Sequence, residues 1–187
     1  HYHHEHRNIY DIYKIIDESQ ISDRAKNISK KIFNIVAKAE SKAHGIDIGK
    51  VHFHEVGAID SIVDIVAVAV CIDNLDIEEV IVSELYEGKG HVKCQHGIIP
   101  VPVPAVTNIV VDNSLSIRIT DTLGEMVTPT GAAIAAALKT KDSLPENHKI
   151  RKVGMGAGKK DFERANILRA FIIEEIYPNS NNDEIWL

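Results

Sequence analysis

Three prolines at alternate positions, Pro100, Pro102 and Pro104, constrain the backbone more strongly than any other feature of the sequence. Proline fixes φ near about −65° and pushes the preceding residue out of the helical region, so this stretch must be extended. Pro104 also suits the first position of a helix, because that position needs no backbone N–H donor. The sequence therefore predicts an extended segment that passes directly into a helix reaching about Val111.

Two helical patterns precede this segment. Apolar residues recur at helical spacing over residues 9–16, and a second stripe covers residues 28–39. Ser22 is a typical N-cap, and Gly45 is placed to end the second helix. We therefore expect two N-terminal helices.

The other segments alternate between extended and helical patterns. Asp60 begins an apolar helix that reaches Leu75, and Thr128 caps a helix of small residues. The glycines of residues 84–97 predict turns. The alternation favours an α/β fold, with a mixed α+β arrangement as the alternative, in which helices pack on a small mixed sheet within a single domain. Strands are expected at residues 51–56, 80–82, 117–119, 150–155 and 167–173.

Composition excludes several partners. The 187 residues carry 21 Lys and Arg against 27 Asp and Glu, a net charge of −6, so there is no basic excess to neutralise nucleic acid. The longest nearly apolar run, residues 62–72, is too short to span a membrane. Two cysteines, Cys71 and Cys94, cannot form a disulfide scaffold, and no charged-then-apolar leader begins the chain. We expect a cytoplasmic protein without nucleic-acid or membrane partners.

Four of the ten histidines lie in the first six residues. A flexible imidazole cluster binds nickel or zinc with modest affinity, because the ligands must be ordered on binding. The alternative is an expression tag, although Tyr2 and Glu5 interrupt the run. We expect residues 1–8 to be a His-rich flexible segment and residues 9–187 to form one α/β domain. No methionine begins the chain and Trp186 follows a strand-like pattern, so we expect truncation from a longer protein at both ends.

Residues 52–64 contain the first candidate metal site. On an extended segment His52 and His54 point to one face, about 7 Å apart. Asp60 and Asp64, one helical turn apart, would complete a mixed nitrogen and oxygen shell that suits divalent nickel, zinc or iron. The alternative is a solvent-exposed strand face with Asp60 as a helix cap. Asp64 interrupts an apolar run, so we expect it to be at least half-buried beside His52 or His54.

Cys94 and His96 form the second candidate. A thiol and an imidazole two residues apart can bind a borderline metal, or act as nucleophile and base. The alternative is a turn with a half-exposed thiol. Cys71, within an apolar run, is expected to fill the core.

Three glycines, Gly154, Gly156 and Gly158, precede Lys159 and Lys160. Backbone N–H groups without a neighbouring Cβ, together with two positive charges, can cradle an anion. The spacing matches neither the P-loop nor the dinucleotide fingerprint. A glycine-rich hairpin is the alternative.

Four longer strings resemble the signatures of one family. They are residues 51–66, 90–105, 124–132 and 154–162. In this order they are similar to the nickel-insertion proteins that complete the nickel-pincer nucleotide cofactor of lactate racemase. A His-rich stretch before the first helix is also typical of that family.

The resemblance implies a cytoplasmic cyclometallase, a lyase that inserts nickel into a pyridinium bis-thiocarboxylate mononucleotide. The metal becomes bonded to a ring carbon and two sulfurs. The family consumes CTP, with a divalent cation, at a site expected in a C-terminal part that this chain lacks. This fragment alone is therefore expected to bind metal or substrate and not to insert nickel. We also expect a homo-oligomer, and transfer of the product to lactate racemase or a related enzyme.

The resemblance also suggests roles for the candidates. The anionic mononucleotide is the expected partner of the segment from Gly154 to Lys160, and His54 or His96 could take the ring proton. Two other functions stay open. One is a nickel-binding metallochaperone module without catalysis, and the other is a metal-dependent hydrolase that uses His52 and His54 with Asp60 and Asp64.

Overall fold

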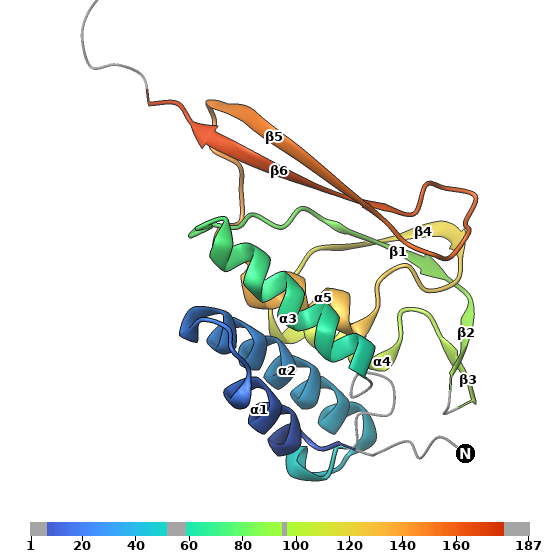
Figure 1. Ribbon diagram of the computed structural model, residues 1–187. Coiled ribbons are helices and arrows are strands. Elements are labelled where there is room, and N and C mark those ends of the chain that lie inside the picture. Colours follow the sequence, from blue (N-terminus) through green and yellow to red (C-terminus); the bar gives the residue numbers. More distant parts are fainter. Residues whose placement is uncertain (1–6, 52–58, 95–96, 178–187) are drawn as a thin grey trace, which may run out of the picture. The chain divides into compact units, whose positions relative to one another are not determined.

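The computed structural model describes residues 7–51, 59–94 and 97–177. Helices come first along these residues and strands and helices are interspersed from residue 85 onward, which confirms the mixed α/β class (Figure 1). Contacts divide the chain into two compact units, residues 1–142 and 143–187. The domain boundaries expected from the sequence stay a prediction. None of the helices that the structure describes combines the length and apolar character needed to cross a membrane.

The first two helices have side-chain N-caps, and the second begins and ends at the residues that the sequence indicated. Asn8 caps α1 (Ile9–Glu18), where its side chain accepts the N–H of Asp11 and the Asp11 carboxylate accepts the N–H of Asn8. Ser22 caps α2 (Asp23–His44) by accepting the N–H of Ala25. The second helix ends at Gly45, whose φ of 64° lies in the left-handed region that favours glycine. A short 3-10 helix, η1 (Ile48–Lys50), follows.

Three further helices complete the helical part of the first unit. They are α3 (Ile59–Asn74), α4 (Pro104–Asp112) and α5 (Pro129–Leu138). Proline occupies the first turn of α4 and α5, as expected, and the Thr128 hydroxyl caps α5 by accepting the N–H of Gly131. The longest helix, α2, contacts each of the other four.

The core lies among these helices. Phe33 and Ile32 of α2 are fully buried, as are Ile12 of α1, Ile65 of α3 and Val106 of α4. Each such side chain contributes about 1.5–3 kcal/mol by leaving water. Apolar residues of four strands pack against the same cluster: Leu85, Val92, Ile99 and Ile117.

The described strands form three two-stranded sheets. In the first unit, β1 (Leu85–Lys89) pairs in parallel with β4 (Ile117–Leu123), and β2 (His91–Cys94) pairs antiparallel with β3 (Gly97–Pro100). The second unit is built on an antiparallel hairpin of β5 (His148–Ala157) and β6 (Ile167–Glu175).

Three local expectations were wrong. Residues 80–82 form only an isolated bridge, because Val80 accepts the N–H groups of Thr140 and Lys141 and pairing does not continue. Residues 84–97 contain two strands, β1 and β2, where turns were expected. Cys71 was expected in the core, but it lies on the exposed side of α3.

Candidate functional site

The acidic half of the first candidate metal site lies at the start of α3. Asp60 and Asp64 are one turn apart, and both are exposed. The expectation that Asp64 is half-buried was wrong, because α3 turns Ile62 and Ile65 inward and places position 64 on the opposite side. His52 and His54 lie outside the described residues. The structure therefore offers two solvent-accessible carboxylates immediately after the segment that carries these histidines.

The second candidate lies at the tip of the β2–β3 hairpin. Cys94 is the last residue of β2, is half-buried and pairs with Gly97. His96 lies outside the described residues, so its distance from the thiol stays untested. Within residues 7–51, 59–94 and 97–177, no three His, Cys, Asp or Glu side chains converge to hold a metal ion.

The glycine-rich candidate is a β-hairpin. Gly154 and Gly156 belong to β5, opposite Ala170 and Leu168, so they are part of the strand ladder. Only Gly158 follows the strand, and its N–H donates to the Asn166 carbonyl at 2.9 Å. The backbone at Gly154 and Gly156 thus belongs to the strand pairing. A ligand could instead contact the loop of residues 158–166, which lines a hollow.

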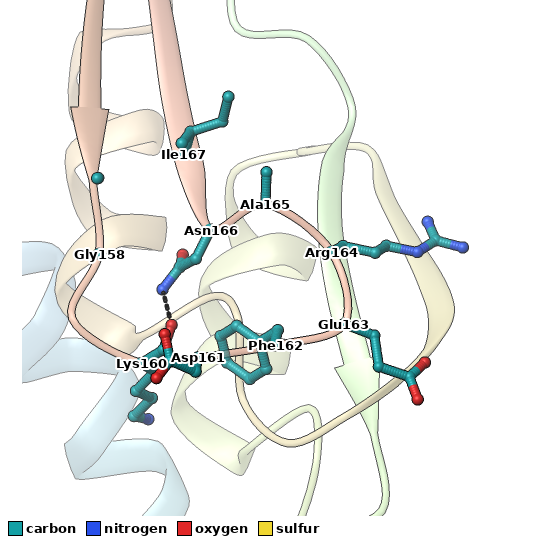
Figure 2. Close-up of a pocket in the computed structure, with 10 residues that line it drawn as sticks. Gly158, Lys160, Asp161, Phe162, Glu163, Arg164, Ala165, Asn166 and Ile167 are labelled. Atoms are coloured by element: carbon teal, nitrogen blue, oxygen red, sulfur yellow. Dashed lines mark hydrogen bonds between the residues drawn. The ribbon is translucent and has the colours of Figure 1, made fainter.

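Asn166 holds this loop together. Its side-chain Nδ2 donates to the Lys160 carbonyl at 3.0 Å, a bond that Figure 2 marks across the neck of the loop. A Cβ at position 158 would lie only 2.2 Å from that same Nδ2, so the side chain of Asn166 fills the space beside Gly158. The sequence singled out Gly158 but gave no signal for Asn166.

A hollow of about 300 Å³ lies along this loop. It has two cations, Lys160 and Arg164, and two carboxylates, Asp161 and Glu163, so its lining carries no net charge. Glu163 and Arg164 extend outward from the loop, whereas the ring of Phe162 lies within it (Figure 2). The lining residues are Ala157, Gly158, Lys160, Asp161, Phe162, Glu163, Arg164, Ala165, Asn166 and Ile167.

A buried carboxylate that the sequence analysis missed lies in the first unit. Glu87 of β1 is fully buried, and its Oε1 accepts the N–H groups of Gly88 at 2.7 Å, Met126 at 2.7 Å and Val127 at 3.2 Å. Its Oε2 has no hydrogen-bond partner among the described residues, and neither has the buried Thr122 hydroxyl. Glu87 therefore fixes the segment that leads into α5. The sequence gives no signal for this role, because Glu87 lies within residues 84–97, whose glycines predict turns.

The shifted titrations lie on other residues. Arg118 Nε donates to Glu84 Oε2 at 2.6 Å, which raises the pKa of Arg118. Arg151 donates to Glu174, which raises the pKa of Arg151 and lowers that of Glu174. Arg118, Arg151 and Glu174 are exposed strand residues held in ion pairs, so their shifts do not mark an active site.

Comparison with known proteins decides the family. The model of the nickel insertion protein family matches residues 1–187. The chain belongs to this family. A pyridinium-3,5-bisthiocarboxylic acid mononucleotide nickel insertion protein from Alkaliphilus metalliredigens is 73% identical over 170 residues, 91% of this chain and 40% of the relative. The protein of the same name from Acetivibrio thermocellus is 45% identical over 187 residues, 100% of this chain and 46% of the relative.

A putative nickel insertion protein from Geotalea daltonii is 45% identical over 181 residues, 96% of this chain and 46% of the relative. The chain thus spans less than half the length of these nickel insertion proteins. No solved structure matches it.

In this member of the nickel insertion family, the candidates fall on three separate elements. Acidic residues begin α3, a thiol ends β2, and a charge-balanced hollow follows β5.

Proposed function

We propose that this chain takes part in inserting nickel into pyridinium-3,5-bisthiocarboxylic acid mononucleotide, as the names of its relatives specify for those proteins. The observation that carries the proposal is the match of all 187 residues to the nickel insertion family. Nickel and the mononucleotide are both substrates of this cyclometallase reaction. CTP with a divalent cation drives it in the longer protein, and the reaction takes place in the cytoplasm.

Nickel is captured by the mixed ligand set that the sequence identifies. Asp60 and Asp64 are exposed on the first turns of α3 and accessible to a metal ion. His52 and His54 supply nitrogen ligands from the preceding segment. Carboxylate and imidazole together suit a borderline divalent ion such as nickel. Cys94, the last residue of β2, and His96 offer a softer second set.

Formation of a nickel–carbon bond releases the proton of that ring carbon, so a base must accept it. We assign this role to His54 or His96, because an imidazole titrates near neutral pH. Two thiocarboxylate sulfurs complete the coordination of the metal. The hollow beside Lys160 holds the mononucleotide, and the product passes to lactate racemase or a related enzyme from a homo-oligomeric protein.

Nickel titration with and without the mononucleotide, followed by mass spectrometry, tests the function. The full-length protein with CTP should yield a mononucleotide that has gained nickel and lost the ring proton. This chain alone should bind nickel and the mononucleotide and give no product. Binding of nickel without any binding of the mononucleotide would favour a metallochaperone module. Metal-dependent turnover of a phosphoester would favour a hydrolase.

The nickel ligands are tested by Asp64→Asn, with Asp142→Asn as the control. Asp142 is also an exposed carboxylate of the first unit, and its side chain pairs with Lys139. Asp64→Asn should weaken nickel binding about tenfold, the lower end of the range for lost support of a metal ligand. Neither change should shift unfolding by more than about 0.5 kcal/mol, because both positions are exposed. Unchanged nickel affinity in Asp64→Asn would remove Asp64 from the site.

Adjacent lysines provide a matched pair for the mononucleotide. Lys160 lines the hollow and Lys159 does not. Lys160→Ala should therefore weaken mononucleotide binding more than Lys159→Ala. The difference should shrink as salt is raised, because ions screen such attraction beyond about 10 Å at 0.1 M. Equal effects of the two changes would place the phosphate elsewhere.

A further inference from the structure

The hollow after β5 does not have the chemistry of a simple phosphate site. Its two cations are matched by Asp161 and Glu163, and a phosphate alone would be repelled by both carboxylates. Its one aromatic side chain, Phe162, is half-buried and lies within the loop (Figure 2). Such a lining fits a ligand that is aromatic and carries charges of both signs.

A pyridinium mononucleotide has this composition. Its ring nitrogen is positive, whereas its phosphate and acid groups are negative. A positive ring is attracted to the face of a phenylalanine and to a nearby carboxylate, here Asp161. The negative groups are attracted to Lys160, whereas the Arg164 side chain extends outward from the loop and adds only longer-range attraction. The hollow therefore offers an oppositely charged partner for each kind of charged group on such a ligand.

We propose that Phe162 is the surface on which the pyridinium ring of the mononucleotide stacks, which rests on the proposed function. The loop is prepared for this role, because Asn166 joins its two sides through the Lys160 carbonyl and the N–H of Gly158. A volume of about 300 Å³ is at the lower end for ligand pockets, which span about 300–1,000 Å³. It suits a single mononucleotide.

Two commercial probes separate the ring from the phosphate. Nicotinate mononucleotide carries a pyridinium ring and a phosphate without sulfur, and ribose 5-phosphate carries the phosphate without the ring. Calorimetric titration of the whole chain should show that nicotinate mononucleotide binds more tightly. Its ring protons should move upfield in proton NMR, because they lie over the face of Phe162.

The deciding variant is Phe162→Leu, which keeps an apolar side chain and removes the aromatic face. It should weaken nicotinate mononucleotide binding by about 5- to 150-fold, the range of one lost base–aromatic stack, and remove the upfield shift. Its affinity for ribose 5-phosphate should not change. Phe171→Leu is the control, because Phe171 is an exposed phenylalanine of β6 outside the hollow. Phe171→Leu should bind both probes as the original chain does.

Three results would overturn the inference: equal affinity of the original chain for the two probes, no saturable binding of nicotinate mononucleotide, or unchanged binding in Phe162→Leu. Its failure is separate from failure of the proposed function. If the full-length protein still metallates its substrate while Phe162→Leu has no effect, only the role of Phe162 is wrong. If no metallated product forms in any variant, the proposed function is wrong.

Discussion

Glu87 ties β1 to the segment before α5 through three backbone N–H groups that converge on one carboxylate oxygen. Backbone donors buried without an acceptor cost about 1–3 kcal/mol each. A single side chain thereby satisfies Gly88, Met126 and Val127 at once.

We expect Glu87→Ala to destabilise the protein by about 3–5 kcal/mol, because it leaves buried donors unpaired and opens a cavity. Glu87→Gln should cost less, about 1–3 kcal/mol, since its amide oxygen still accepts while its NH₂ lacks an acceptor. Urea unfolding followed by circular dichroism measures both. Glu78, which is exposed, gives the matched control. Glu78→Ala and Glu78→Gln should stay within about 0.5 kcal/mol of the original chain. Equal stability of Glu87→Ala and Glu87→Gln would contradict the role of the three donors.

At the scale of elements, the β5–β6 hairpin is fastened by an ion pair at an irregularity in the register. The pairing shifts between Ile150 and Lys152, which makes Arg151 the extra residue of a β-bulge. Arg151 donates to Glu174 on the opposite strand and lowers the pKa of that carboxyl, with smaller help from Lys149. A two-stranded hairpin is only marginally stable by itself, so one cross-strand pair is noticeable.

The hairpin should therefore loosen in acid. Because the pKa of Glu174 is lowered from its ordinary value of 4.5, the pair stabilises the folded state fully above pH 4.5. That stabilisation is lost as the pH falls through the lowered pKa. NMR titration should give Glu174 a midpoint below 4.5 in the original chain and a midpoint near 4.5 in Arg151→Met. Salt should reduce the difference, since both groups are exposed. Identical midpoints would show that the pair does not form in solution.

The elements that the sequence predicted well are those with local signals. Ser22, Gly45 and Thr128 begin or end helices by contacts within a few residues. Strand β1 was missed because Gly88 looks like a turn residue. In the structure, Gly88 lies in a strand whose backbone approaches β4, and a Cβ there would lie 2.0 Å from the Gly124 carbonyl oxygen. That contact joins residues far apart in the sequence, so no local pattern reveals it.

In the candidate site, too, features with local sequence signals were easier to predict than features that depend on contacts between distant residues. Residue types and spacing singled out Asp60, Asp64 and Lys160 as candidate ligands, and in the structure Asp60 and Asp64 are exposed and Lys160 lines the hollow. Burial of Asp64 was wrong because an apolar neighbour need not be buried: Val63, beside it, is 57% exposed. The roles of His52, His54 and His96 stay predictions. Asn166 and Glu87 act through backbone groups brought close by folding, which the sequence does not display.

At the scale of the whole molecule, the two compact units meet in the chain at residues 142 and 143. Thr140 and Lys141 are still bonded to Val80 in the first unit. Leu144, beyond them, is 55% exposed, and residues 142–147 lie in neither a helix nor a strand. Exposed backbone outside regular structure opens at little cost, so this connection is the weakest described part of the chain between its two units.

Limited digestion with a glutamyl endopeptidase should test that division. Glu146 should be cut, because it is exposed and lies in the irregular connection of residues 142–147 between the two units. Mass spectrometry should show a fragment that ends at Glu146, and its circular dichroism should keep the helical signal of α1 to α5. Disappearance of the intact chain without such a fragment would contradict two separately compact units.

Gly158 and Asn166 have a consequence for how this loop can change by mutation. A methyl group at 158 meets the side chain of Asn166, and Asn166 in turn secures the Lys160 carbonyl. Gly158→Ala should therefore be damaging alone and much less so once Asn166→Gly has cleared the space. The double variant should fall short of the sum of its single effects by roughly 0.5–3 kcal/mol, the usual range for residues in contact. Substitutions at these two positions are thus epistatic. A homologue in which Asn166 is replaced first can then tolerate side chains at position 158 that the original chain cannot.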